Sequence, residues 1–365
     1  LVDRYAPYRR LLKNRLVASG AWKSDKDGRA ARLHAGSTPE RLILLITRRC
    51  QLRCSYCDIQ EYGGDISEED VVKAVDFLFT STRRSLTLQF FGGEPLLRFD
   101  LIQKAVARAL ELNGRHKKAL SFLVTTNGLL LQPEKIEYFQ RHNFNVEVSC
   151  DGKKESQLRY RKSGQADYYP VLARNLEAIR KSANKYYLIM TVMPDMVGLL
   201  EDNFRYLAEL GHRRIQINYA IGVSWTRAQA LGFLEQMGIV LEYAAKQPGL
   251  ELINSTELRR EPIVLNIALA AEGIFAFFLE SGFLNLREEM SLVVIGEGGL
   301  DARGVTPFES FWRLSRACAK RKPEVRRTLL NNIRMGWLVD RWLRRWRLRS
   351  GGDARLLAKQ WAVIP

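Results

Sequence analysis

The feature that most constrains the fold of this chain is the alternation of short apolar strands with amphipathic helices between residues 41 and 245. We count six strand–helix units, and each predicted strand ends near Gly, Asn or Asp. Alternation of this kind favours parallel βαβ units with right-handed crossovers. The pattern therefore predicts an α/β fold in which residues at the carboxyl ends of the strands meet in one site.

The individual units are marked by apolar periodicity and by end signals, such as the glycine that closes a helix at position 211. The predicted strands begin near residues 41, 85, 121, 145, 186 and 214, and helices are predicted over 68–82, 98–113, 133–143, 168–183 and 201–211.

The flanking segments lack this alternation. We expect residues 1–40 to be a basic, polar lead-in and residues 41–245 to be the strand–helix domain. Beyond it we expect a small capping extension over 246–306, which includes a strand pair near 262–281, and basic helices over 307–365. We find no internal repeat with a convincing period.

The chain is strongly basic, with 57 Lys and Arg against 40 Asp and Glu and a formal net charge of +17. Thirteen of the basic residues and two acidic ones lie within 313–349, where tryptophans also gather. Such a segment could bind nucleic-acid phosphates, bind an acidic peptide, or form the solvated side of helices whose tryptophans pack on the strand–helix domain. The last is the commonest origin of charge runs, and we do not expect a nucleic-acid partner.

Hydropathy excludes other classes of protein. Hydrophobic residues make up 46% of the chain and charged residues 27%, a balance typical of globular proteins. No apolar stretch reaches the roughly 18 residues that span a bilayer, and the first twenty residues lack the apolar core of a secretory signal. We therefore expect a cytoplasmic protein with no membrane partner.

Three of the five cysteines lie within eight residues, as Cys50, Cys54 and Cys57, directly after the first strand. Three thiolates on one loop can hold three irons of a cubane 4Fe–4S cluster and leave the fourth iron open for chemistry. A zinc site would need a fourth ligand, and the nearest histidine, His34, lies sixteen residues upstream. The alternatives are a zinc knuckle or a chance cluster.

The C-x3-C-x2-C spacing, with Tyr56 just before the last cysteine, resembles the signature of the radical S-adenosylmethionine (radical SAM) superfamily. The resemblance covers about residues 41–225. It implies a partial (β/α)6 barrel of the TIM type, here with a small C-terminal extension and basic C-terminal helices. It also implies one 4Fe–4S cluster on Cys50, Cys54 and Cys57, with S-adenosylmethionine (SAM) on the open iron and Tyr56 near the adenine.

Later motifs arrive in the order of the same family. The Gly92-Gly93-Glu94-Pro95 segment resembles the one whose backbone and glutamate contact the methionine amino group. A glycine pair permits close backbone approach, and a carboxylate suits an ammonium. Asn127 closes the strand that ends in Thr-Thr-Asn-Gly.

The segment Ser149-Cys150-Asp151-Gly152 resembles the one that closes the fourth strand, and it implies that Ser149 lies near the ribose or the methionine carboxylate. Arg161 matches an arginine associated with the SAM carboxylate, with Arg159 as its rival. The chain departs from the family here, because Gln157 and Leu158 stand where a His-Asp pair is common.

The resemblance implies reductive cleavage of SAM to a 5′-deoxyadenosyl radical that abstracts hydrogen from a substrate. The strand motifs are most similar to the branch with SPASM or Twitch extensions, which is dominated by peptide and protein maturases. Those extensions use extra cysteines for auxiliary clusters, whereas only Cys150 and Cys318 remain here. Residues 262–305 would then be a degenerate Twitch-like hairpin without metal, or a simple cap.

The two remaining thiols have two interpretations each. Cys150 could return a hydrogen atom to a substrate radical, as a peptide epimerase requires, and Cys318 could do so from a helix over the barrel mouth. A small buried hydrophobe is the simpler interpretation of either cysteine. We expect neither thiol to be essential.

The leading hypothesis is a radical SAM enzyme that abstracts hydrogen from a peptide or protein. Its partners would be that substrate, possibly as an acidic precursor peptide, and an external one-electron reductant of the flavodoxin or ferredoxin type. One alternative is a radical SAM enzyme for a small metabolite or nucleoside. Another is a non-enzymatic iron–sulfur or nucleic-acid-binding protein.

Overall fold

The computed structural model describes most of the predicted strand–helix region and short pieces beyond it. The described residues are 41–57, 65–164, 167–220, 223–253, 292–295, 331, 334–336, 338–339, 342–343 and 346. The predictions for the lead-in over 1–40, for the strand pair near 262–281 and for Cys318 lie outside these residues.

The molecule is built on one sheet in which every described strand pairing is parallel. The strand order is β10-β1-β3-β4-β5-β7-β8-β9, so all six predicted strands are adjacent in the predicted sequence order. The strands of this sheet are β1 (Arg41–Thr47), β3 (Ser85–Gly92), β4 (Ala119–Thr126), β5 (Phe144–Ser149), β7 (Lys185–Val192), β8 (Arg214–Tyr219), β9 (Glu251–Leu252) and β10 (Leu292–Ile295).

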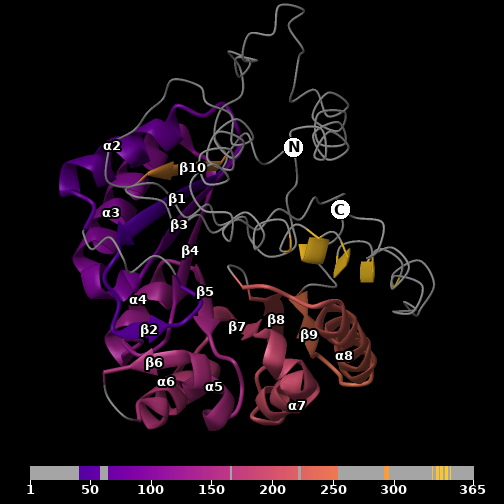
Figure 1. The fold of residues 1–365 in the computed structure, drawn as a ribbon. Coiled ribbons are helices and arrows are strands. Elements are labelled where there is room, and N and C mark those ends of the chain that lie inside the picture. Colours follow the sequence, from indigo (N-terminus) through magenta and orange to yellow (C-terminus); the bar gives the residue numbers. More distant parts are fainter. Residues whose placement is uncertain are drawn as a thin grey trace, which may run out of the picture.

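Helices connect the strands and cover one side of the sheet. In Figure 1 the strands follow a curve from β10 to β9, and the helices lie along the outer side of that curve. The helices are α2 (Glu68–Phe79), α3 (Phe99–His116), α4 (Pro133–Arg141), α5 (Lys154–Tyr160), α6 (Tyr169–Lys181), α7 (Leu200–Glu209) and α8 (Arg227–Ala245), with the 3-10 turns η3 (Pro95–Arg98) and η4 (Pro194–Leu199).

The sheet is open, because β10 and β9 are its two edges in the described part of the chain. The predicted α/β class and the open barrel of six strand–helix units are confirmed. A further strand, β10, pairs with β1 and extends the sheet. None of the described helices is both long enough and apolar enough to cross a membrane.

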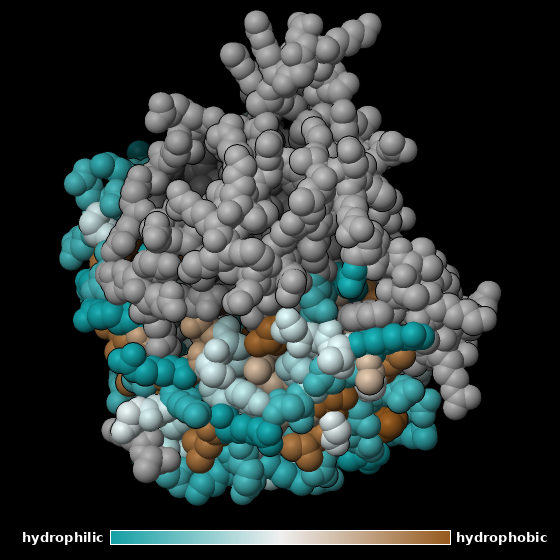
Figure 2. All heavy atoms as spheres, viewed as in Figure 1, coloured by the Kyte–Doolittle hydropathy of each residue, from teal (hydrophilic) through white to brown (hydrophobic). Residues whose placement is uncertain are grey.

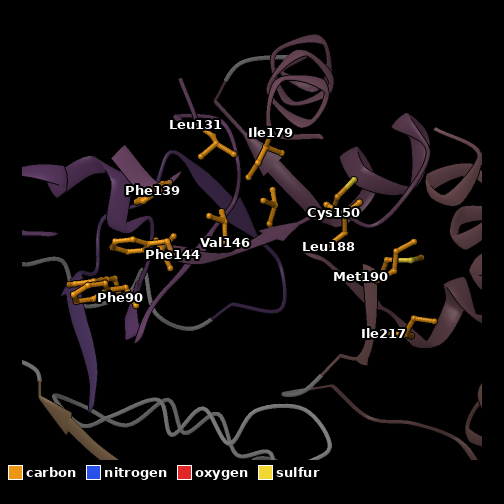
Figure 3. Close-up of a cluster of buried hydrophobic side chains, with 14 of the residues drawn as sticks. Phe90, Leu131, Phe139, Phe144, Val146, Cys150, Ile179, Leu188, Met190 and Ile217 are labelled. Atoms are coloured by element: carbon orange, nitrogen blue, oxygen red, sulfur yellow. The ribbon is translucent and has the colours of Figure 1, made fainter. Parts of the chain in front are cut away.

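The apolar core lies between the strands and these outer helices. Successive strand residues point to opposite faces of a sheet, so one set of alternate residues faces the helices. Figure 3 shows this set as it runs from Phe90 through Val146 and Leu188 to Ile217, on four different strands. The rings of Phe90 and Phe144 stack with their centroids 5.8 Å apart.

A second, two-stranded sheet lies outside the main one. The strand β2 (Leu52–Cys54) pairs antiparallel with β6 (Arg161–Ser163), and we refer to the pair as the β2–β6 ribbon. Neither β6 nor the short helix α5 before it is predicted from the sequence. Three-residue strands have no periodicity to recognise, and their pairing is set by residues more than a hundred positions apart.

The described C-terminal residues pack against α8. Trp342 is buried and stacks on Trp346 with ring centroids 5.4 Å apart, and a Cβ added to Gly238 of α8 would lie 3.5 Å from the Trp342 ring. The Asn331 side chain bonds both the backbone N–H and the carbonyl of Trp225. These contacts agree with the interpretation that C-terminal tryptophans pack on the barrel.

Candidate functional site

The loop that carries the three cysteines is fastened to the end of β3 by backbone hydrogen bonds. The Gly93 N–H donates to the Thr47 carbonyl over 2.8 Å, and the Glu94 N–H donates to the Arg49 carbonyl over 2.9 Å. A Cβ on Gly93 would come within 3 Å of the carbonyl oxygens of Arg48 and Arg49. The glycine therefore lets the end of β3 approach the cysteine loop, whereas the predicted close approach of a ligand to this backbone stays a prediction.

The Glu94 carboxylate ties this point to the end of β4. It is fully buried, and it accepts hydrogen bonds from the Thr126 hydroxyl over 2.8 Å, the Asn127 N–H over 2.8 Å and the Leu96 N–H over 3.0 Å. Burial raises the pKa of Glu94 to about 7 despite these donors. This clamp between two strand ends is a role that the sequence analysis missed.

Asn127 continues the connection from β4 to the cysteine loop. Its Nδ2 donates to the Cys50 Sγ over 3.5 Å, and its Oδ1 accepts from the Leu129 N–H over 3.0 Å. The Gln51 Nε2 lies 3.4 Å from the same oxygen. The predicted site residue Asn127 is thus in direct contact with the predicted metal ligand Cys50.

The three thiols have the chemistry that iron requires. Cys50, Cys54 and Cys57 are free cysteines, partly exposed and within eight residues of one another in the sequence. The Cys50 Sγ accepts the Leu52 N–H over 3.4 Å, and burial raises the pKa of this thiol to about 12. Because the ligand of iron is the thiolate, a bound metal would have to offset the free-energy cost that burial adds to deprotonation.

The donor set of this loop fits a 4Fe–4S cluster, since three thiolates and N–H donors to sulfur are what such clusters use. Across the described residues, no three His, Cys, Asp or Glu side chains converge closely enough to hold a metal ion. The assignment of the three cysteines as ligands stays a prediction.

Arg161 and Asp151 form a buried ion pair beside the cysteine loop. The Arg161 Nε lies 2.7 Å from Asp151 Oδ2 and the Arg161 Nη2 lies 2.9 Å from Asp151 Oδ1, with both side chains about 5% exposed. Across the β2–β6 ribbon, Arg161 stands opposite Cys54, and its guanidinium lies 5.6 Å from the centroid of the Tyr56 ring. The Tyr56 hydroxyl reaches Asp151 Oδ2 over 3.4 Å.

The departure from the family pattern has a local explanation in this pair. The buried Gln157 side chain accepts the Asp151 N–H over 2.8 Å, so it helps to hold the carboxylate that holds Arg161. The rival Arg159 is exposed and pairs with Asp195 over 2.6 Å. Arg161 is therefore the arginine at the strand ends, and its expected contact with the SAM carboxylate stays a prediction.

Ser149 and Cys150 stand at the end of β5. Ser149 is partly exposed, whereas Cys150 is fully buried in the apolar core, where Figure 3 shows it near Leu188. Burial raises the pKa of the Cys150 thiol to about 12. The packing agrees with the interpretation of Cys150 as a small buried hydrophobe.

An apolar wall next to Tyr56 was missed in the sequence analysis. Met193 and Met196 follow β7, Ala220 follows β8, and these three residues form a small core cluster with Tyr56 packed against it. Met193 and Ala220 come directly after the last strand residues, and Met196 lies in the turn η4 just beyond, which is where site residues are expected in parallel sheets. That placement is the signal that could have found them.

The sheet face that points away from the helices carries a row of polar residues. Gln89, Thr125, Glu147 and Tyr187 alternate with core residues on β3, β4, β5 and β7. The strand register places Thr125 opposite Glu147 and Glu147 opposite Tyr187. Gln89 donates to Thr125 over 3.3 Å, and the Thr125 and Tyr187 hydroxyls both donate to Glu147. Polar residues at every second strand position were visible in the sequence but were not used.

Comparison with known proteins identifies the domain. The radical SAM superfamily model matches residues 44–209. "Uncharacterized protein MJ0907" of Methanocaldococcus jannaschii is 30% identical over 183 residues, which are 49% of this chain and 62% of that protein. The cysteine-type anaerobic sulfatase-maturating enzyme of Clostridium novyi is 23% identical over 48% of this chain and 49% of its own length.

Two further comparisons bear on fold and substrate. Fe-coproporphyrin III synthase of Methanosarcina barkeri is 27% identical over 50% of this chain and 47% of that protein. The structure of native anSMEcpe with bound AdoMet superposes with a TM-score of 0.52 at 19% identity, over 57% of this chain and 61% of that one. The chain thus spans only about half to three-fifths of the length of these four proteins.

The family model, the strand order and the motifs at the strand ends agree with one another. Radical SAM proteins use a 4Fe–4S cluster and S-adenosylmethionine, and the superposed structure holds the latter. Residues 44–209 therefore form a radical SAM domain, as the resemblance of the motifs predicted.

Proposed function

We propose that this protein is an enzyme that binds a 4Fe–4S cluster through Cys50, Cys54 and Cys57 and uses S-adenosylmethionine to modify a peptide or protein. The observation that carries the proposal is the cysteine loop itself. Three thiols follow β1, and hydrogen bonds from the ends of β3 and β4 fasten their loop at the carboxyl edge of the sheet.

The residues around the loop are suited to the parts of SAM. When bound, the cluster and SAM would supply the one-electron cleavage that yields a carbon radical. The Gly92-Gly93 backbone and the Glu94 carboxylate would receive the methionine ammonium, and an ammonium beside Glu94 would keep that carboxylate ionised despite its burial. Ser149 and Arg161 would face the methionine carboxylate or the ribose.

Tyr56 and the apolar wall after β7 and β8 would hold the adenine. A planar aromatic base suits a tyrosine ring beside methionine side chains. The same wall would keep water away from a reactive radical.

Two observations support a peptide or protein as the substrate. The sulfatase-maturating relative has the same domain, and in the described part of the chain the sheet does not close between β9 and β10. The polar row from Gln89 to Tyr187 offers hydrogen-bond partners to such a chain. An acidic precursor peptide would suit the net charge of +17.

A small metabolite is the second candidate, and one comparison favours it. Fe-coproporphyrin III synthase matches 50% of this chain, so the domain also occurs in a protein that is named for a small molecule. A peptide or protein substrate would change in mass, whereas an enzyme for a small metabolite would leave the mass of any polypeptide unchanged.

The test has two stages. Anaerobically reconstituted protein reduced with dithionite should form 5′-deoxyadenosine, measured by mass spectrometry. Replacing Cys54 with Ala should abolish this product, while Cys150→Ala should not. Candidate peptides co-expressed with the protein are then examined for a mass shift. Wild-type protein that holds a cluster but forms no 5′-deoxyadenosine would contradict the proposal.

A further inference from the structure

The exposed side of the β2–β6 ribbon carries two cations face to face. Arg53 and Lys162 are directly opposite each other in the strand register, and both side chains are exposed. Like charges in this position destabilise a strand pair, so packing and pairing do not account for them. Two like charges held side by side at the surface would be relieved by a bound anion, so the pair is suited to bind an acidic partner.

Other exposed basic residues near the site differ in having acidic partners. Arg49 pairs with Asp65, Lys154 pairs with Asp167, and Arg159 pairs with Asp195. No ion pair joins either Arg53 or Lys162 to a described carboxylate. Their positive charge is therefore not neutralised by the described part of the protein.

The opposite side of the same ribbon carries the cysteine. Alternation along each strand turns Cys54 and Arg161 inward while their neighbours Arg53 and Lys162 turn outward. A partner on the outer side would be separated from Cys54 by little more than the thickness of the ribbon. In contrast, a substrate must reach the inner side, where the strand ends gather.

We propose that Arg53 and Lys162 form the docking site of an acidic one-electron donor protein, of the flavodoxin or ferredoxin class. This inference rests on the proposed function, because the electron must have a cluster to enter. The donor protein would lose one electron and the cluster would gain one, and no bond to the protein would form or break. The two cations would steer the donor and set its orientation at the ribbon.

The test uses holoprotein and a recombinant bacterial flavodoxin as the probe. The flavodoxin is reduced in advance, and loss of cluster absorbance is followed by anaerobic stopped-flow. We expect Arg53→Glu/Lys162→Glu to slow reduction by flavodoxin about tenfold or more at low salt, because electrostatic steering changes association rates by 10–1000-fold. Added salt should slow the wild type toward the variant and change the variant little.

A matched control comes from the amino ends of the strands of the main sheet. Arg83 and Arg84 are exposed neighbours just before β3, at the amino ends of the strands. Arg83→Glu/Arg84→Glu changes the net charge equally and should leave the flavodoxin rate close to that of the wild type. Arg53→Lys/Lys162→Arg keeps both charges and should do the same.

Dithionite, a small reductant, separates docking from damage to the cluster. We expect it to reduce the glutamate variant at the wild-type rate. If reduction by dithionite also slows, the rates no longer isolate docking, and the affinity of flavodoxin for the variant is measured by calorimetry instead. An affinity equal to that of the wild type overturns the proposal. If dithionite causes no bleaching even in the wild type, the proposed cluster fails, whereas the affinity measurement still tests the docking site.

Two other results would overturn the proposal. One is an equal flavodoxin rate in the wild type and the glutamate variant at low salt. The other is binding of a 15-residue poly-glutamate peptide that depends on Arg53 and Lys162 while the flavodoxin rate does not. That result would assign the ribbon to an acidic peptide instead.

Discussion

At the scale of single residues, the site depends on buried polar groups that join strand ends. Glu94 is the clearest case, because its carboxylate has no exposed surface and three hydrogen-bond donors from η3 and the end of β4. Burying a carboxylate costs free energy unless donors compensate for the lost water. The raised pKa of Glu94 shows that three donors compensate only in part.

The raised pKa of Glu94 predicts a stability change with pH. The folded state holds this proton up to about pH 7, while the unfolded chain releases it near its ordinary value of 4.5. The free energy of unfolding should therefore fall as the pH rises from about 4.5 to about 7 and stay level above that. Glu94→Gln cannot titrate there, so the difference between the two proteins in urea titrations should follow this window. A difference that does not vary with pH would contradict the prediction.

The pair of Asp151 and Arg161 predicts an asymmetric response to mutation. Asp151→Asn removes the charge that compensates a buried guanidinium, and breaking a buried pair costs about 3–5 kcal/mol. We expect a loss of that order in the free energy of unfolding, with weaker retention of iron because Cys54 and Tyr56 rest on the pair. Asp167→Asn, at an exposed pair with Lys154, should cost about 1 kcal/mol or less. Equal losses in the two variants would contradict this account.

Cys150 predicts a small effect on stability and none on SAM cleavage. The thiol is packed in the core among apolar side chains, so Cys150→Ala should cost about 1 kcal/mol in unfolding free energy. Formation of 5′-deoxyadenosine should be unchanged. A variant that still cleaves SAM but no longer yields the normal product would instead identify Cys150 as a hydrogen donor.

The sequence was informative about which residues lie at the site, and less about what they touch. The motifs predicted that Cys50, Glu94, Asn127 and Arg161 belong to one site. In the structure Asn127 contacts both Glu94 and Cys50, and Arg161 lies opposite Cys54. The partners of Arg161 could not be predicted, because a guanidinium can pair with any acid that the fold brings near it. Neighbours hold Asp151 in place for this pair, because its N–H donates to Gln157, its Oδ1 accepts from the Thr191 N–H and its Oδ2 accepts from the Tyr56 hydroxyl.

At the scale of elements, the strand ends meet because glycine permits it. Gly93 has the carbonyl oxygens of Arg48 and Arg49 where a Cβ would stand, so the end of β3 and the cysteine loop are in backbone contact. The β2–β6 ribbon closes the same loop from the other side through the Ser55 N–H and the Tyr160 carbonyl, 2.9 Å apart. The long strands and helices were predictable from periodicity, whereas this ribbon was not.

This contact predicts opposite outcomes for two glycine substitutions. Gly93→Ala forces backbone atoms apart at the cysteine loop, so we expect lower iron content per chain and a lower unfolding temperature. Gly114→Ala, in α3, meets no atom within 4 Å and should be neutral or stabilising by up to about 1 kcal/mol. Iron analysis and thermal denaturation of both variants test the contrast, and normal iron content in Gly93→Ala would argue against a close fit at the loop.

At the scale of the whole molecule, one curved parallel sheet positions the candidate site residues at its carboxyl edge and separates an apolar face from a polar one. On the side of the molecule drawn in Figure 2, hydrophilic residues cover much of the described surface, with separate apolar residues among them. The helices take the apolar side of each strand, and the polar row from Gln89 to Tyr187 takes the other. The alternation of strands and helices predicted this architecture because each strand–helix unit is formed by residues close together in the sequence. The identity of the substrate could not be predicted, because it depends on surfaces for which the sequence has no motif.

We predict that Cys50, Cys54 and Cys57 hold one cubane cluster and that this chain binds no second cluster. The most direct measurement is the iron and acid-labile sulfide content of anaerobically reconstituted protein, for the wild type and for a variant with all three cysteines replaced by alanine. We predict about four irons and about four sulfides per wild-type chain, as one cubane requires, and almost none in the variant. About eight irons per chain, stoichiometric zinc, or a variant that keeps its iron would contradict the account.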